Sequence, residues 1–203
     1  MPIFKPPMSM AQFLEASRGT WLNRRSIHHL DHQDDEAADS NLVIEPFDAT
    51  DPVVEKVCAV FEVEASRSQG GGRFWWEGNL KQGSRNDDYA AVIVDVPEEV
   101  DSRRGFLLRD VGYVEKKAVI STYAFADDGV LTITTRYDTN VGTERCWFVT
   151  DQVRMRVSSV QYLSGVSMTT YCTELRCPTD EDIKSISQQA RQLADSPALE
   201  PKS

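Results

Sequence analysis

The chain has 203 residues, 40% of them hydrophobic and 27% charged, which is typical of a water-soluble domain with a sizeable core. Its net charge of −10 argues against non-specific binding to nucleic acid or to an anionic membrane surface, because both need a basic protein surface. The longest apolar run, near residues 90–94, is far too short to span a membrane.

The N-terminus and the cysteines bear on the cellular compartment. Residues 1–8 have no apolar core or cleavage pattern of a secretory signal, and their prolines predict a flexible arm. We therefore expect a cytosolic protein. None of its four cysteines forms a C-x-x-C pair, so we predict free thiols in or near the core and no metal site; they are Cys58, Cys146, Cys172 and Cys177.

Three helices are predicted along the chain. Ser9 and Gln12 resemble a capping box, and the apolar face that follows predicts a short helix ending before Gly19. Asp51 and Pro52 begin a second helix. The third belongs to a C-terminal region, 178–203, predicted as a helix and a disordered tail.

Alternating apolar residues and turn signals predict ten strands. We place them at 20–31, 41–47, 72–80, 89–96, 104–110, 117–126, 130–138, 142–150, 152–162 and 165–176. The acidic stretch 31–40 reads as a solvated loop, and Gly70–Gly72 as a break before a strand. Because most strands are sequential hairpins, we expect an antiparallel meander that closes into a barrel and encloses a ligand cavity.

The first strand carries several side chains with functional chemistry. Gly19 and Trp21 form the G-x-W signature of calycin-type barrels. Strand alternation places Trp21, Arg25 and His29 on one face and His28 on the other. Adjacent histidines that point to opposite faces cannot easily share a metal ion, whereas histidines suit proton transfer near neutral pH.

Three later sets of residues each allow two interpretations. Arg154 and Arg156 share one strand face, which points either to water or inward to bind a carboxylate. Trp75 and Trp76 point to opposite faces, so either one lines a cavity while the other packs outside it or at an interface, or both serve only core and surface packing. Glu174 is either a surface carboxylate or a buried acceptor for a cationic or N–H-rich ligand.

Six ordered blocks resemble a known family. Arg25-Ser-Ile-His-His-Leu30 is similar to the R-T-x-H-H-L segment of the S-type phycobiliprotein lyases, the CpcS/CpeS-like bilin lyases. The other blocks are Gly105–Lys116, Tyr137–Thr139, Glu144–Phe148, Val153–Arg156 and Ser167–Arg176. The blocks lie within residues 13–176, and together they are specific for this family.

The resemblance implies a fold and an activity. It implies a mainly β domain over residues 9–177, a ten-stranded antiparallel barrel like that of lipocalins and fatty-acid-binding proteins, with a few short helices. It also implies that the protein binds a linear tetrapyrrole, such as phycocyanobilin or phycoerythrobilin. The lyase would attach this bilin by a thioether bond to a cysteine of a phycobiliprotein alpha or beta subunit. The bilin is a transient substrate, and we expect no tightly bound cofactor.

The family's motifs and the chemistry of a bilin suggest roles for the matched residues. The two propionates need cations, for which Arg25, Arg154 and Arg156 are candidates. Glu174 could face the pyrrole N–H groups, and His28 or His29, with preference for His29, could relay a proton. Aromatic walls for the conjugated plane would come from Trp21 and from either Trp75 or Trp76.

Two alternatives stay open from the sequence. A non-catalytic lipocalin-like carrier of a hydrophobic anion would use the same barrel and arginines. A helper subunit in a heteromeric lyase would explain departures from the family pattern, such as Cys146 in place of leucine. We expect phycobiliprotein subunits as partners, a homodimer or a related lyase subunit as a further option, and the cyanobacterial cytoplasm or a plastid stroma as the location.

Overall fold

The computed structural model describes residues 5–31, 34–77, 85–111, 117–163 and 165–177. Its helices are α1 (Met10–Ser17), α2 (Pro52–Val60) and the 3-10 turn η1 (Ala65–Arg67). Its strands are β1 (Gly19–His29), β2 (Asp34–Phe47), β3 (Gly70–Glu77), β4 (Arg85–Pro97), β5 (Arg104–Arg109), β6 (Val119–Phe125), β7 (Leu131–Arg136), β8 (Asn140–Phe148), β9 (Val153–Tyr162) and β10 (Gly165–Cys177). The C-terminal helix and tail predicted for 178–203 lie outside the described residues.

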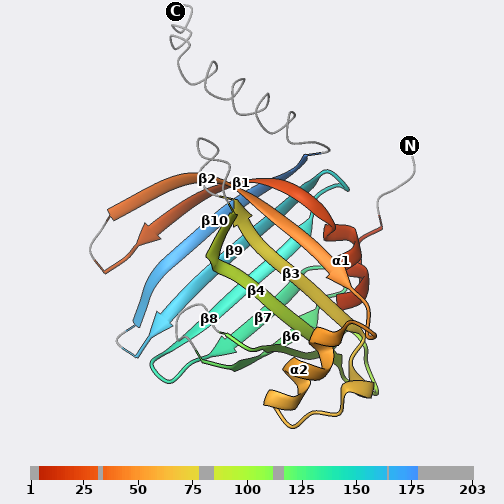
Figure 1. Cartoon of the computed structure of the whole chain (residues 1–203). Helices are drawn as coiled ribbons and strands as arrows, with labels where there is room; N and C mark the ends of the chain where they lie inside the picture. Colours follow the sequence, from red (N-terminus) through yellow and green to blue (C-terminus); the bar gives the residue numbers. More distant parts are fainter. Residues whose placement is uncertain (1–4, 32–33, 78–84, 112–116, 164, 178–203) are drawn as a thin grey trace, which may run out of the picture.

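The strands form one closed antiparallel barrel (Figure 1). Each strand pairs with its neighbours in the sequence, and β1 pairs with both β2 and β10, which closes the sheet. Closure gives each of the ten described strands a partner on both sides. This architecture confirms the predicted ten-stranded meander. In the described part, no helix is long and apolar enough to cross a membrane.

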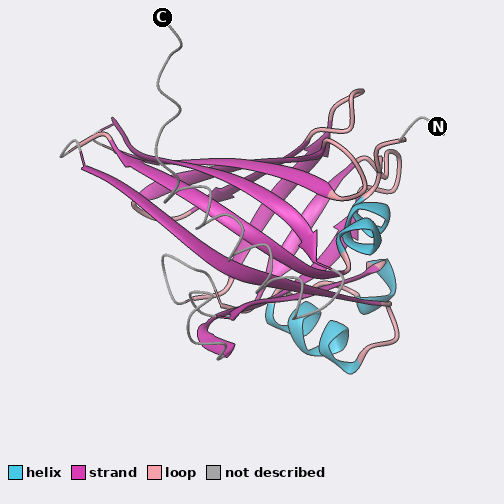
Figure 2. Ribbon diagram, turned by 90° about the horizontal axis from the view of Figure 1, so that it is seen from above, coloured by secondary structure: helices cyan, strands magenta, loops and turns pink. Residues whose placement is uncertain are grey.

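Helix α1 plugs one end of the barrel, which we call the closed end (Figure 2). The Ser9 hydroxyl accepts a hydrogen bond from the Gln12 amide at 3.3 Å, so Ser9 caps the helix as predicted. The apolar face of α1 packs into the barrel core through Met10, Phe13 and Leu14, all of them buried. The plug closes this end, whereas no helix of the described residues covers the opposite end, which we call the open end.

Helix α2 covers the outside of the barrel. Asp51 accepts a hydrogen bond from the Val53 amide at 3.0 Å, which fixes the helix start at Pro52. Its buried face packs against the outward side chains of β4 and β5, in a cluster formed by Val54, Val57, Cys58, Val94, Val96 and Leu108. The outside of β4 and β5 is therefore a second core, separate from the barrel interior.

The prediction of a loop at 31–40 was wrong, because β2 begins at Asp34. The acidic residues pair across the strands with basic residues of β1. His28 and Asp35 lie 2.8 Å apart, and Arg24 donates to Asp39 at 3.2 Å. Opposite charges facing each other on neighbouring strands favour pairing, so an acidic run continues a strand when its partner is basic.

The strand predictions also began too late at β3 and β4. Strand β3 starts at Gly70 rather than at residue 72, and β4 starts at Arg85 rather than at residue 89. A Cβ atom on Gly71 would lie 2.0 Å from the Ile93 carbonyl oxygen and 2.7 Å from the Phe47 ring. The glycine run therefore belongs to the strand and allows a close approach of neighbouring groups.

The barrel has unequal walls. The adjacent strands β1, β2 and β10 have 11, 14 and 13 residues, and β4 has 13, whereas β5 and β7 have six each. Figure 1 shows β1 and β2 projecting at the end of the barrel opposite α1. Each residue of a strand adds about 3.3 Å to its length, so these three neighbouring strands are longer than β5 and β7. We call β1, β2 and β10 the extended wall.

Candidate functional site

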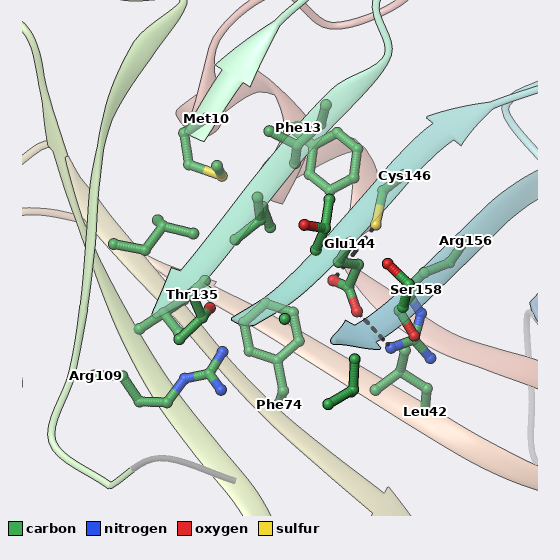
Figure 3. A pocket seen from close by; sticks show the side chains of 18 of the residues that line it. Met10, Phe13, Leu42, Phe74, Arg109, Thr135, Glu144, Cys146, Arg156 and Ser158 are labelled. Carbon is green, nitrogen blue, oxygen red and sulfur yellow. Dashed lines mark hydrogen bonds and ion pairs between the residues drawn. The ribbon is translucent and has the colours of Figure 1, made fainter. Parts of the chain in front are cut away.

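A cavity of about 270 Å³ lies inside the barrel above α1 (Figure 3). Its apolar lining comprises Met10, Phe13, Leu14, Leu42, Phe74, Trp76, Ile93, Leu107, Leu131 and Ile133. Its polar lining includes Arg109, Thr135, Tyr137, Asn140, Glu144, Arg154, Arg156 and Ser158. An apolar pocket with a few convergent polar groups is the usual form of a small-molecule site.

A buried network of charges lies on one side of the cavity. Arg156 donates to Glu144 at 3.2 Å and to Glu174 at 3.1 Å. Arg154 donates to the second oxygen of Glu174 at 2.6 Å and to the Ser17 hydroxyl at 2.7 Å. Glu174 thus holds both arginines, and the network ties the cavity wall to the last residue of α1.

The surrounding charges keep this network ionised. Burial alone would raise the pKa of Glu174, but the charges and hydrogen bonds of Arg154 and Arg156 outweigh it and lower that pKa. Burial alone would lower the pKa of Arg156, but the charges of Glu174 and Glu144 raise it well above its ordinary value. Arg156 therefore remains a cation inside the barrel.

The strand register explains why these residues meet. Arg156 lies directly opposite Cys146 of β8 and Cys172 of β10, and Arg154 lies opposite Phe148 and Glu174. Directly opposed residues share a face of the sheet, and here that face is the barrel interior. Arg154 is only 3% exposed. Arg154 and Arg156 therefore point into the barrel and not to water.

Trp21 closes the barrel rather than lining the cavity. Its side chain is fully buried, and its indole N–H donates to the Ser17 carbonyl at 2.8 Å. The guanidinium carbons of Arg154 and Arg176 lie 4.9 and 4.3 Å from the Trp21 ring, the range of cation–π contacts. Arg176 also donates to two carbonyls at the end of α1, so this cluster fastens the plug.

The structure separates the two adjacent tryptophans. Trp76 faces Leu42 across the strands and lines the cavity. Trp75 pairs with Val43 on the outer face of the sheet. One tryptophan therefore lines the cavity while the other packs outside it, and the one that lines the cavity is Trp76.

The candidates on β1 lie on the extended wall. Arg25 is directly opposite Cys172, and His29 is opposite Met168, which places both on the inner face. His28 lies on the outer face, with its ring centroid 5.6 Å from that of Tyr171. These three residues are not among those that line the cavity, and the inner two extend its inner surface toward the open end.

The two interior thiols flank the network. Arg156 donates to the Cys172 sulfur at 3.6 Å, and the Cys146 thiol donates to Glu144 at 3.6 Å. Burial raises the pKa of both thiols above their ordinary value. They are therefore protonated at neutral pH and are poor nucleophiles. All four cysteines are free and buried, as predicted.

Sequence reasoning missed Glu144 and Arg109. Glu144 lines the cavity with its side chain 34% exposed, whereas Glu174 is fully buried and is not among the lining residues. Strand alternation could have found Glu144, because it shares the inward register of Cys146 and Phe148 on β8. Figure 3 shows the Arg109 guanidinium pointing into the cavity across from the Glu144–Arg156 pair. The site thus offers cations from two sides, one accessible carboxylate and an apolar wall.

The chain resembles known proteins over most of its length. A family model described as CpeS-like protein matches residues 9–177. "Chromophore lyase CpcS/CpeS" of Synechococcus sp. (strain WH8020) is 66% identical over 189 residues, which cover 93% of this chain and 94% of that protein. "Phycocyanobilin lyase subunit CpcS" of Picosynechococcus sp. (strain ATCC 27264 / PCC 7002 / PR-6) is 33% identical over 170 residues, which cover 83% and 86%.

The fold agrees with these sequence matches. The solved structure of the S-type phycobiliprotein lyase CPES from Guillardia theta superposes with a TM-score of 0.67 at 27% identity, and it covers 85% of this chain and 94% of that one. The resemblance predicted from the six sequence blocks is therefore confirmed. The chain belongs to the CpeS-like protein family.

Proposed function

We propose that this chain is a chromophore lyase that binds a linear tetrapyrrole and attaches it to a cysteine of a phycobiliprotein alpha or beta subunit. The observation that carries the proposal is the Glu144–Arg156 pair on the wall of an otherwise largely apolar cavity. It offers the charge complement of a bilin, which has anionic propionates and a cluster of pyrrole N–H groups. The names of the relatives support the same activity.

The size of the cavity suggests how a bilin would sit. A volume of about 270 Å³ lies just below the range of roughly 300–1,000 Å³ that encloses most of a drug-sized ligand. A tetrapyrrole would therefore enter only in part. Its remaining length would extend through the open end along the extended wall, past Arg25 and His29.

The proposed roles divide the charged residues by their access to the cavity. Arg109 and Arg156 would bind propionates, and Glu144 would accept hydrogen bonds from the pyrrole N–H groups. Glu174, with both oxygens occupied by arginines, would act as a positioning residue that orients Arg154 and Arg156. Trp76 would stack on the conjugated plane.

The proposed reaction is an addition and needs no oxidant. The sulfur of the acceptor thiolate forms a bond to the exocyclic carbon of the bilin's ethylidene group, and the carbon–carbon π bond breaks. The electron pair moves into a ring that protonation of the tetrapyrrole has made electron-poor, and the proton from the thiol balances the product. His29, on the inner face of the extended wall, remains the candidate for proton transfer, and His28 faces outward.

Replacing Glu144 tests the proposed contact with the pyrrole nitrogens. Glu144→Gln keeps the side chain's size but removes its charge, so we expect the long-wavelength absorbance of bound, protonated phycocyanobilin to fall several-fold. The bilin Kd should rise only by about three- to tenfold, since one charge-assisted hydrogen bond contributes about 1 kcal/mol more than a neutral one. Absorbance titration measures both quantities.

Glu55→Gln is the matched control, because Glu55 lies on the exposed side of α2, away from the cavity. It should leave both the spectrum and the Kd unchanged. An unaltered spectrum in Glu144→Gln would contradict the role proposed for Glu144.

The protonated interior thiols predict that no bilin becomes attached to the lyase itself. Cys146→Ser and Cys172→Ser should each retain transfer to the acceptor within about threefold, because serine can replace the thiol in the hydrogen bonds with Glu144 and Arg156. Mass spectrometry of the denatured wild-type lyase after loading should give the mass of the bare chain. A bilin adduct on either cysteine would overturn the direct-transfer scheme.

A helper subunit is the second candidate, and one relative named as a lyase subunit favours it. Adding phycocyanobilin and then an apo-subunit separates the options. A lyase that acts alone, as a monomer or homodimer, yields a zinc-fluorescent adduct on the subunit, whereas a helper yields it only with a related lyase chain. A carrier gives only a reversible colour shift. The proposed compartment is that of the phycobiliproteins, the cyanobacterial cytoplasm or a plastid stroma.

A further inference from the structure

In the part of the chain that the structure describes, α1 blocks one end of the cavity and leaves the other end for an acceptor protein to approach. At the closed end, α1 fills the barrel with Phe13 and Leu14, and the Arg154–Ser17 and Arg176–Ala16 hydrogen bonds hold it in place. Two cavity residues mark the other end: Tyr137 directly follows β7, and Val160 lies near the end of β9. An acceptor cysteine must therefore meet the bilin at the open end.

Two hairpins of the barrel present exposed apolar side chains at this end. Leu30 follows β1 and is 55% exposed, while Tyr162 and Leu163 at the β9–β10 turn are 42% and 93% exposed. The hairpins are neighbours, because β1 pairs with β10 up to the contact of His29 with Met168. Exposed apolar residues grouped beside a ligand site are typical of protein-binding surfaces.

Carboxylates border these apolar residues. Asp31 follows Leu30 directly, and Asp35 and Glu36 are exposed at the start of β2. An apolar centre with a charged rim is the common anatomy of a protein interface, and complementary charge on the partner speeds the encounter. The partner that fits is a polypeptide surface with an exposed apolar residue bordered by lysine or arginine.

We propose that Leu30, Asp31, Tyr162 and Leu163, which we call the docking tips, bind the acceptor subunit next to its acceptor cysteine. The proposal rests on the proposed lyase function and specifies how the acceptor is recognised. The docking tips bind a basic segment of the acceptor at the open end of the barrel. The cysteine beside that segment then lies against the end of the bilin that emerges from the cavity.

The test measures transfer as a function of acceptor concentration. Full-length lyase is loaded with phycocyanobilin, and an apo-subunit is titrated to give kcat and the KM for the acceptor. Leu30→Ser with Leu163→Ser should raise this KM about tenfold, the usual effect of losing interface anchors, with kcat and the bilin Kd unchanged. Asp31→Lys should raise the KM for the acceptor. In this variant the KM should also rise less steeply with NaCl concentration than it does in wild type.

The closed end supplies matched controls. Val100, 98% exposed, and Glu99 lie on the β4–β5 hairpin at the end that carries α1. Val100→Ser and Glu99→Lys should leave the KM and its salt dependence as in wild type.

The outcomes separate the docking surface from the lyase function. A normal KM in both tip variants, while wild type still forms the adduct, would overturn the docking surface alone. Weaker bilin binding in the Leu30 and Leu163 variants would place these residues in the cavity and would also overturn it. If wild type formed no bilin adduct on the acceptor subunit, either alone or together with a related lyase chain, both the proposed function and the docking surface would be wrong.

Discussion

Replacing Glu174 with glutamine is expected to lower the free energy of unfolding by about 3–5 kcal/mol, the usual cost of removing one partner from a buried ion pair. Glu174 is fully buried, and its two oxygens accept hydrogen bonds from Arg154 and Arg156. The neutral amide would remove the counter-charge of the buried Arg154 and one of the two carboxylates that pair with the partly buried Arg156. Urea denaturation at pH 7 measures the loss.

The surface pair Arg24–Asp39 provides the control for Glu174→Gln. These side chains are 54% and 35% exposed, so Asp39→Asn should cost less than about 1 kcal/mol. Equal losses in the two variants would show that the buried network contributes no more than a surface ion pair does.

The Glu174 substitution also has a signature in pH. The pKa of Glu174 in the folded protein lies below its ordinary value of 4.5, so its contribution to stability is present above pH 4.5 and is lost as pH falls through the folded pKa. Wild type should therefore lose stability below about pH 4.5 more steeply than Glu174→Gln. Parallel stability curves for the two proteins in that range would contradict the lowered pKa.

Replacing Asp95 with asparagine is expected to stabilise the protein at alkaline pH. Asp95 is 2% exposed, and burial raises its pKa from 3.8 to about 7, with the nearby Tyr123 hydroxyl offsetting a smaller part. Its contribution to stability is therefore fully present below pH 3.8 and is lost as pH rises to about 7. The total loss is on the order of 4 kcal/mol, and asparagine, which does not titrate, should restore much of it at pH 8.

Thermal or urea unfolding from pH 4 to 8 tests the Asp95 prediction. The Asp95→Asn variant should lack the decline that wild type shows between about pH 4 and pH 7. Asp128→Asn is the control, because Asp128 is an exposed turn residue whose side-chain oxygen accepts a hydrogen bond from the Val130 amide, which asparagine can also do. A wild-type decline that persists in Asp95→Asn would assign the pH dependence to other groups.

The sequence predicted the barrel because its signals were local. Strand alternation and turn residues determine the order of the hairpins, and ten strands that are mostly joined by hairpins have few ways to cover their edges other than closure. Alternation also placed Arg25 and His29 on one face, in agreement with the register. Such predictions need only the two-residue period of a strand.

The errors concern pairings between distant residues. The acidic residues at 34–39 look like a loop until they are set against Arg24 and His28 of β1. Likewise, the two arginines of β9 look equivalent along the sequence, and only the register with β8 and β10 shows that Glu174 is shared and Glu144 is accessible. Composition cannot supply these relations, because they arise when the barrel closes.

We propose that the charged cavity serves to attach a bilin to another protein. The most direct test is peptide mapping by mass spectrometry of an apo-phycobiliprotein subunit incubated with phycocyanobilin, with and without this chain. We expect the chain to direct an unoxidised thioether adduct to one cysteine, and Glu144→Gln to reduce its yield. The proposed function would be contradicted if the mixture of adducts were the same with and without the chain, and if adding a related lyase subunit did not change this.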